Sequence, residues 1–161
     1  KINVEAIYEL PLPCQFVFLG TGSKKYENQL TKLAKKYPKK ISAQIQFDEP
    51  LAHLIYAAAD IFLMPSRFEP CGLGQMIAMR YGTVPLVYAT GGLADTVNEK
   101  DGFIFKDFTS NNLFNTLKSA LNIYYNRPGA WRQLQQHGME KNFSWDKSAK
   151  EYLIIYKKLL K

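Results

Sequence analysis

The sequence has few cysteines and no long hydrophobic run. Only two of its 161 residues are cysteines, Cys14 and Cys71, which is too few for the disulfide framework of a small secreted domain. No cluster of cysteines and histidines has the spacing of a zinc site. No apolar stretch approaches the roughly 20 residues that a membrane helix needs, and no signal-peptide pattern opens the chain. These absences favour a soluble cytoplasmic protein with two free thiols, no metal and no membrane partner.

Positive charge predominates, with a formal net charge of +7. The lysines gather at 24–25, 32–40 and 157–161, on segments that resemble exposed helix faces. No interleaved aromatic platform and no nucleic-acid motif accompanies them, so we expect a solvated basic surface and no nucleic-acid partner. A basic domain still attracts a small anion such as a nucleotide diphosphate.

Short apolar segments alternate with helical patterns along the chain. Strands are expected at 15–19, 41–47, 61–64, 84–88 and 102–105, and helices at 26–37, 50–59, 72–81, 112–125, 128–140 and 145–160. Strands that are apolar throughout indicate a sheet covered on both faces, which is typical of parallel sheets. The sequence therefore predicts an α/β fold with a doubly wound, mostly parallel, Rossmann-like sheet of about five strands and extra C-terminal helices. Without repeats or low-complexity linkers, we expect residues 1–161 to form a single domain.

Both ends of the sequence suggest part of a longer protein. A helical pattern at 2–10 stands where a doubly wound domain would begin with a strand. The last expected helix carries more apolar residues than one narrow face should hold. It either packs over the edge of the domain or reaches another domain.

The loop after the third expected strand contains Ser66-Arg67-Phe68-Glu69-Pro70-Cys71-Gly72-Leu73-Gly74-Gln75. Such a loop opens a helix, whose free N–H groups and partial positive charge suit a phosphate. Gly72 and Gly74 would let the backbone approach an anion closely. Glu69 would accept hydrogen bonds from hydroxyl groups of the same ligand. The alternative is an ordinary capped helix in which Glu69 only complements the dipole.

Two further glycine loops follow other strands. Thr90-Gly91-Gly92-Leu93-Ala94-Asp95-Thr96-Val97 comes after the fourth strand and would line the same crevice, unless it is only a tight turn capped by Thr90 or Asp95. Gly20-Thr21-Gly22 begins like a dinucleotide fingerprint, but Lys25 stands in place of its third glycine, so it is a weak signal.

Together, the octapeptide 66–73, Arg80-Tyr81-Gly82-Thr83-Val84-Pro85 and the loop 90–97 resemble the bacterial glycogen synthases and plant starch synthases. The likeness extends over 51–60 and Phe143-Ser144-Trp145, and so over nearly the whole chain. It implies a retaining glycosyltransferase of the two-Rossmann-domain (GT-B) type, of which this chain would be the C-terminal, donor-binding domain. The implied partners are ADP-glucose or UDP-glucose, and an α-1,4-glucan acceptor reached through an N-terminal domain that the chain lacks. The resemblance implies no cofactor, and a cytoplasmic location, or a plastid in a plant.

The resemblance also implies roles for individual residues. The catalytic contact to the transferred sugar falls to Glu69. The residues implied around the sugar and phosphates are Cys71, Gly72, Leu73, Gly74 and Gln75; those near the base are Phe47 and Gln46; and those of a possible cleft loop are Thr90, Gly91 and Gly92.

Departures from the family pattern qualify these roles. The basic residues that clamp the diphosphate would precede Lys1, so we expect this chain alone to bind nucleotide weakly and to transfer no sugar. Gly74 stands where the family often has threonine, which predicts weakened donor binding. Ile77 replaces the second glutamate of the wider superfamily and so removes a ribose ligand.

Two other interpretations remain open at this point. The chain could belong to a retaining glycosyltransferase with another acceptor, such as sucrose or a lipid, or be a non-catalytic nucleotide- or glucan-binding module. We expect His53, His137 and the thiol of Cys71 to have no catalytic role, and Trp131 and Trp145 to be core residues rather than platforms for a glucan.

Overall fold

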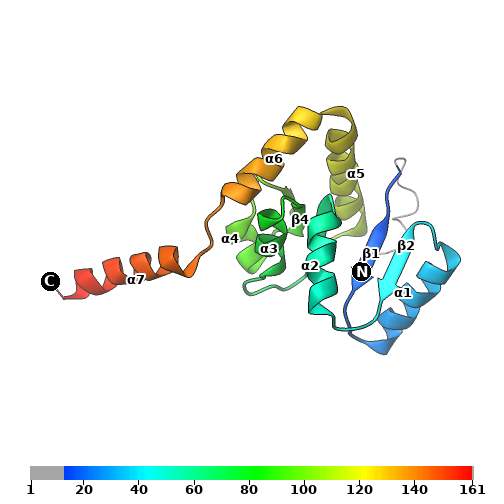
Figure 1. Ribbon diagram of the computed structural model, residues 1–161, viewed down its shortest axis with the longest axis horizontal. Coiled ribbons are helices and arrows are strands. Elements are labelled where there is room, and N and C mark those ends of the chain that lie inside the picture. Colours follow the sequence, from blue (N-terminus) through cyan, green and yellow to red (C-terminus); the bar gives the residue numbers. More distant parts are fainter. Residues whose placement is uncertain (1–12, 161) are drawn as a thin grey trace.

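The computed structural model describes residues 13–160, in which five strands and seven helices alternate (Figure 1). The strands are β1 (Phe16–Leu19), β2 (Ile41–Gln44), β3 (Ile61–Met64), β4 (Val84–Tyr88) and β5 (Phe103–Phe105). The helices are α1 (Lys24–Lys36), α2 (Glu49–Ala58), α3 (Gly74–Arg80), α4 (Gly91–Thr96), α5 (Ser110–Asn126), α6 (Pro128–Glu140) and α7 (Trp145–Leu159). The α/β class and the extra C-terminal helices are confirmed. The helical pattern predicted at 2–10 lies outside the described residues.

Local signals explain most of the element boundaries. Helix α2 begins where Asp48 accepts a hydrogen bond from the N–H of Leu51 at 2.9 Å, with Pro50 in its first turn. Helix α3 ends before Gly82, whose φ of 81° is the left-handed conformation that glycine tolerates. Strands β3 and β4 have the predicted limits.

Two predicted elements are longer than the observed ones. Helix α3 begins at Gly74 rather than at Gly72, because the φ of 74° at Gly72 is incompatible with a right-handed helix. Strand β2 ends at Gln44, so Gln46 and Phe47 belong to the loop before α2. In both places the functional candidates lie in a loop.

All of the strand pairs are parallel, but the strands do not form the single sheet that the sequence predicts. Strand β1 pairs with β2 in one sheet, and β3, β4 and β5 follow one another in a second. Within residues 13–160, no strand pairing joins β1 to β3. In a doubly wound sheet of order 3-2-1-4-5-6, the 2-3 pair and the 4-5-6 group lie on opposite sides of the first strand. The β1–β2 sheet corresponds to the 2-3 pair, and the β3–β4–β5 sheet corresponds to the 4-5-6 group.

The core lies on both faces of β4, because successive side chains of a strand point to opposite faces. On one face, Leu86 joins a buried cluster with Phe105 and residues of α5. On the other face, Val87 packs with Met79 of α3 and Leu93 of α4. Trp131 is also in the core, as predicted, and only 5% of it is exposed. Burial on both faces explains why the strand is apolar throughout.

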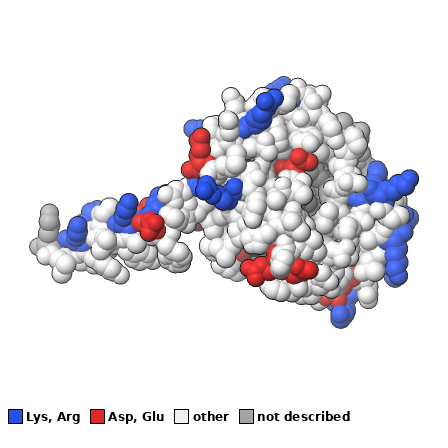
Figure 2. Space-filling model, viewed as in Figure 1, with Lys and Arg blue, Asp and Glu red and all other residues white. Residues whose placement is uncertain are grey.

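Helix α7 extends away from the rest of the structure (Figure 1), and none of its residues is buried. Trp145, predicted to be a core residue, is 85% exposed, so that prediction is wrong. The helix does not pack over the edge of the fold. Its exposed apolar residues are Trp145, Tyr152, Leu153, Ile154, Ile155, Tyr156 and Leu159. Lysines lie along α7 and over α1, where they expose positive charge (Figure 2).

None of the helices in residues 13–160 is long and apolar enough to cross a membrane.

Candidate functional site

The loop between β3 and α3 presents a row of backbone donors. Within residues 13–160, nothing accepts a hydrogen bond from the N–H groups of Cys71, Gly72, Leu73 or Gly74. Gly72 has a positive φ of 74°, whereas Leu73 is right-handed. Adjacent residues of opposite hand turn their N–H groups toward one side, which creates a concavity that binds anions. The loop therefore has the geometry of a phosphate site.

Glu69 lies two residues before this row of donors and is half-buried. Its backbone carbonyl accepts a hydrogen bond from the N–H of Gly92 at 3.2 Å. The described residues provide no hydrogen-bond or salt-bridge partner for its carboxylate, which is free to accept hydrogen bonds from a ligand. Cys71, next to it, is exposed and is a free thiol, as is Cys14.

The second glycine loop packs directly against the first. A Cβ on Gly91 would collide with the carbonyl of Glu69, and one on Gly92 would collide with the carbonyl of Cys71. Gly92 is buried, and it begins the short helix α4 together with Gly91. Thr90 forms no side-chain cap. The glycines at 91 and 92 thus allow the two loops to pack backbone against backbone.

Gly74 is glycine for a packing reason that the sequence did not reveal. A Cβ at this position would lie 2.9 Å from the ring of Phe62 and 3.3 Å from the hydroxyl of Tyr56. A threonine would not fit here unless the ring of Phe62 moved. The N–H of Gly74 remains available, and its effect on donor binding stays a prediction.

Gln75, which the sequence grouped with the ligand contacts, points into the protein. Its side chain has no exposed surface, and its Nε2 lies 3.2 Å from the carbonyl of Cys71, 2.8 Å from that of Gly72 and 3.0 Å from the hydroxyl of Thr96. The structure therefore places Gln75 behind the loop. Nothing in the sequence indicated that the side chain of Thr96 contacts Gln75, because the two residues are 21 positions apart.

Phe47 and Gln46, the candidates for the base, follow β2 in the other sheet. Phe47 is 89% exposed, so its ring is free to stack on a ligand. Gln46 is exposed as well, and its amide donates to Asp48 at 3.1 Å. The structure places both residues in a loop after a parallel strand, as it does the two glycine loops.

The loop Gly20–Gly22 is held by a side chain that the sequence analysis overlooked. Glu27 of α1 accepts a hydrogen bond from the N–H of Gly22 at 2.9 Å and forms an ion pair with Lys24 at 2.8 Å. The hydrogen bond from Lys24, together with that from the Gly22 N–H, lowers the pKa of Glu27. Because the N–H of Gly20 also donates to the carbonyl of Gln44 at 3.1 Å, two N–H groups of this loop are already satisfied by the protein.

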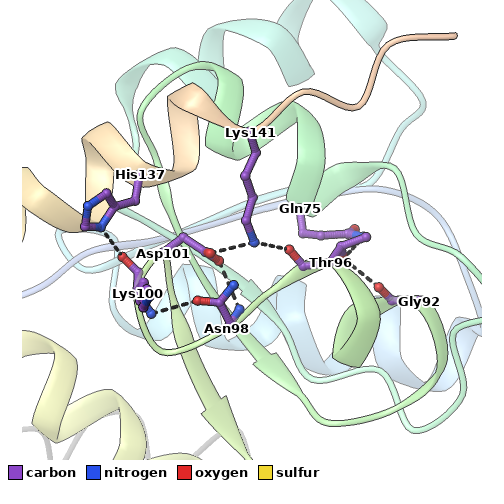
Figure 3. A network of polar contacts seen from close by, with 8 residues as sticks. All are labelled: Gln75, Gly92, Thr96, Asn98, Lys100, Asp101, His137 and Lys141. Atoms are coloured by element: carbon purple, nitrogen blue, oxygen red, sulfur yellow. Dashed lines mark hydrogen bonds and ion pairs between the residues drawn. The ribbon is translucent and has the colours of Figure 1, made fainter. Parts of the chain in front are cut away.

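Two hollows lie away from the glycine loops. One, of about 250 Å³, is lined by residues that include Asp101, His137 and Lys141, and the other, of about 350 Å³, lies beside Lys118 and Arg127. Figure 3 shows how Lys141 reaches between Asp101 and Thr96. His137 donates through Nδ1 to the carbonyl of Lys100 at 2.9 Å, and exposed His53 contacts the hydroxyl of Tyr81 at 2.9 Å. Neither histidine adjoins the row of free N–H groups in the sequence or through a hydrogen bond.

Comparisons with known proteins agree with the resemblance seen in the sequence. The profile of the family described as "Glycosyl transferases group 1" matches residues 4–136. The chain is 52% identical over 160 residues to a glycogen synthase of Thermotoga petrophila and 54% identical over 153 residues to one of Thermotoga maritima. These alignments cover 95% and 91% of this chain but 33% and 32% of those proteins, so the chain spans about a third of their length.

A solved structure shows the same likeness in three dimensions. The catalytic domain of starch synthase IV from Arabidopsis thaliana, bound to ADP and acarbose, matches with a TM-score of 0.84 and 34% identity. The match covers 96% of this chain and 34% of that chain. The Rossmann-like GT-B fold predicted from the sequence is therefore confirmed.

Proposed function

Because this chain belongs to the glycosyl transferases group 1 family, we propose that it binds the nucleotide-sugar donor of a glycogen or starch synthase. The observation that carries this proposal is the row of unpartnered N–H groups from Cys71 to Gly74, at the opposite-handed pair Gly72–Leu73. Such a concavity suits the diphosphate of a sugar nucleotide. The similarity to glycogen synthases supports the nature of the sugar.

The proposed roles follow from what each group presents. The N–H groups of Leu73 and Gly74 hold the distal phosphate, and the backbone at Cys71 and Gly72 contacts hydroxyls of the sugar. Glu69 accepts hydrogen bonds from the transferred glucose through its unpaired carboxylate. The exposed ring of Phe47, with Gln46 next to it, lies against the base. ADP-glucose is the donor we favour over UDP-glucose, because the similar starch synthase structure holds ADP.

The proposed reaction is transfer of glucose to the non-reducing end of an α-1,4-glucan with retention of configuration. The bond between the anomeric carbon and the diphosphate oxygen breaks, and the diphosphate leaves with the electron pair. A new bond forms to the acceptor hydroxyl oxygen, whose proton passes to the departing diphosphate. Negative charge therefore grows on the leaving group, where backbone N–H groups stabilise it. No metal has a role in this scheme, so treatment with a chelator should leave donor binding unchanged.

In this proposal the acceptor glucan binds to a second α/β domain of a longer enzyme. Two features support it: the chain spans about a third of its curated relatives, and the apolar residues of α7 have no partner within residues 13–160. The longer enzyme would work in the cytoplasm, or in the plastid of a plant.

Two experiments test the proposal. The chain alone, incubated with ADP-glucose and a glucan primer, should release no ADP, because the groups that bind the acceptor are not in it; steady ADP release would contradict the assignment as a donor domain. In the longer enzyme, Glu69→Ala should reduce glucose transfer by at least about a hundredfold, the effect typical of a group that acts in the transition state. Unchanged transfer would show that Glu69 does not contact the sugar. Glu49→Ala, in the exposed first turn of α2, is the control.

A further inference from the structure

The side-chain amide of Gln75 is used at one end only. Its Nε2 carries two hydrogens and lies within hydrogen-bond distance of three acceptors, so one N–H is shared: the carbonyls of Cys71 and Gly72 in the β3–α3 loop and the hydroxyl of Thr96. Because carbonyls can only accept, these contacts require the nitrogen at this end of the amide. The oxygen Oε1 is buried and has no hydrogen-bond partner in the part of the chain that the structure describes. A buried side chain that uses its donors and leaves its acceptor unsatisfied is present for its donors, since a methionine would fill similar space without the unsatisfied oxygen.

Thr96 connects this amide to the second glycine loop. Its hydroxyl donates to the carbonyl of Gly92 at 2.5 Å, which leaves a lone pair to accept from Gln75 at 3.0 Å. Gly92 in turn donates through its N–H to the carbonyl of Glu69. The two glycine loops are therefore joined twice, once through their backbones and once through Gln75 and Thr96.

Lys141 fixes the other side of Thr96. Its Nζ donates to the backbone carbonyl of Thr96 at 2.6 Å and forms an ion pair with Asp101 at 2.5 Å (Figure 3). Asp101 is 1% exposed, and it also accepts from the N–H of Asn98 at 3.0 Å. The buried carboxylate thus holds the lysine in place. Lys141 is the first residue after α6, in the link that leads to α7.

We propose that Lys141, Thr96 and Gln75 are positioning residues that hold the two glycine loops in the arrangement that binds the donor diphosphate. None of them touches the donor in this proposal. They act by fixing the carbonyls of Cys71 and Gly72 inward, which leaves the N–H groups of the same loop facing outward. Preorganised donors bind an anion more tightly than a loop that must first be ordered. This inference rests on the proposed function for the identity of the ligand.

The first test of these three positioning residues, which we call the relay, uses no ligand. In amide NMR spectra of the chain, Thr96→Val should shift the resonances of Cys71, Gly72 and Gly92, and Thr96→Ser, which keeps the hydroxyl, should restore them. Lys141→Met should produce shifts at the same loop amides, and Lys141→Arg smaller ones. Leu117→Val, a core substitution in α5, is the matched control: it lowers the unfolding midpoint but should leave the loop amides unchanged. Loop resonances that stay at their wild-type positions in both Thr96→Val and Lys141→Met would overturn the proposal.

The second measurement is ADP affinity by calorimetry. Thr96→Val should weaken ADP binding by about three- to tenfold, the equivalent of one hydrogen bond, and Thr96→Ser should bind like the wild type. Weakening of the same size in Leu117→Val would show that affinity follows stability alone and would overturn the positioning role. If the wild-type chain binds no ADP, the proposed function fails, whereas the ligand-free spectra still decide whether the relay orders the loops. If Thr96→Val does not fold, the double variant Lys141→Met/Asp101→Asn decides by the same criteria, because it removes the lysine without leaving a buried, unpaired carboxylate.

Discussion

The α-carbon of Gly92 lies so close to the carbonyl of Cys71 that no side chain fits between the two glycine loops. The same residue donates its N–H to the carbonyl of Glu69, so it contacts two residues of the segment 69–74, which carries the proposed ligand contacts. This contact between loops gives the site its shape, and it can be disturbed by one methyl group.

We expect Gly92→Ala to separate the loops. The added Cβ meets backbone atoms, which cannot rotate away, so the substitution should cost about 1–3 kcal/mol of unfolding free energy and also abolish measurable ADP binding. Gly129→Ala is the control, because nothing lies within 4 Å of a Cβ there. It should stabilise the chain by about 0.4–1 kcal/mol and leave ADP binding unchanged. Chemical denaturation and calorimetry measure the two effects; wild-type stability and binding in Gly92→Ala would contradict the packing of the loops.

A second prediction concerns pH and Glu27. Its pKa is lowered in the folded chain, so its contribution to stability is present above its ordinary pKa of 4.5 and is lost as the pH falls through the lower folded value. Glu27→Gln should therefore lower the unfolding midpoint at pH 7, and the difference from wild type should close progressively below pH 4.5. A constant gap between Glu27→Gln and wild type down to acid pH would show that the loss does not come from the charge.

A third prediction concerns the exposed helix α7. Trp145 is 85% exposed and Trp131 only 5%, so the two should differ in fluorescence. Trp145→Phe should remove the red-shifted emission that acrylamide quenches readily, and Trp131→Phe should remove the protected component. Emission that is equally protected in both variants would mean that α7 is covered in solution.

The same exposure sets an expectation for stability. Leu153→Ser and Tyr156→Ser should change the unfolding free energy of this chain by less than about 0.5 kcal/mol, because substitutions at exposed positions usually have effects of that size. Leu117→Ala, in the core cluster of α5, should cost about 2–5 kcal/mol. If the α7 substitutions were as costly as the core one, α7 would have to pack on the rest of the chain.

The sequence predicted the parts of the fold that depend on local patterns. The limits of β3 and β4 were predicted from their apolar runs, and the start of α2 was predicted to within one residue. The place of Glu69 after a parallel strand followed from the same patterns. These features depend on residues that are neighbours in the chain, which is why a single sequence reveals them.

What the sequence did not predict depends on contacts between distant residues. The burial of Gln75 depends on Thr96, and the need for glycine at position 74 depends on the ring of Phe62. Trp145 was assigned to the core because large aromatic residues are usually buried, but within residues 13–160 no residue of α7 is buried. The division of the strands into two sheets was also missed, since strand runs in a sequence do not show which strands pair.

The central claim is that a sugar nucleotide binds at the backbone donors of the β3–α3 loop. An NMR titration of this chain with ADP tests it directly, with the amides of Cys71, Gly72, Leu73 and Gly74 as reporters. We predict that these four amides shift more than any others and saturate together, and that UDP shifts them less at equal concentration. Shifts centred on another surface, such as the hollow beside Asp101 and His137, or no change at the four amides with ADP on the order of 10 mM, would contradict the account.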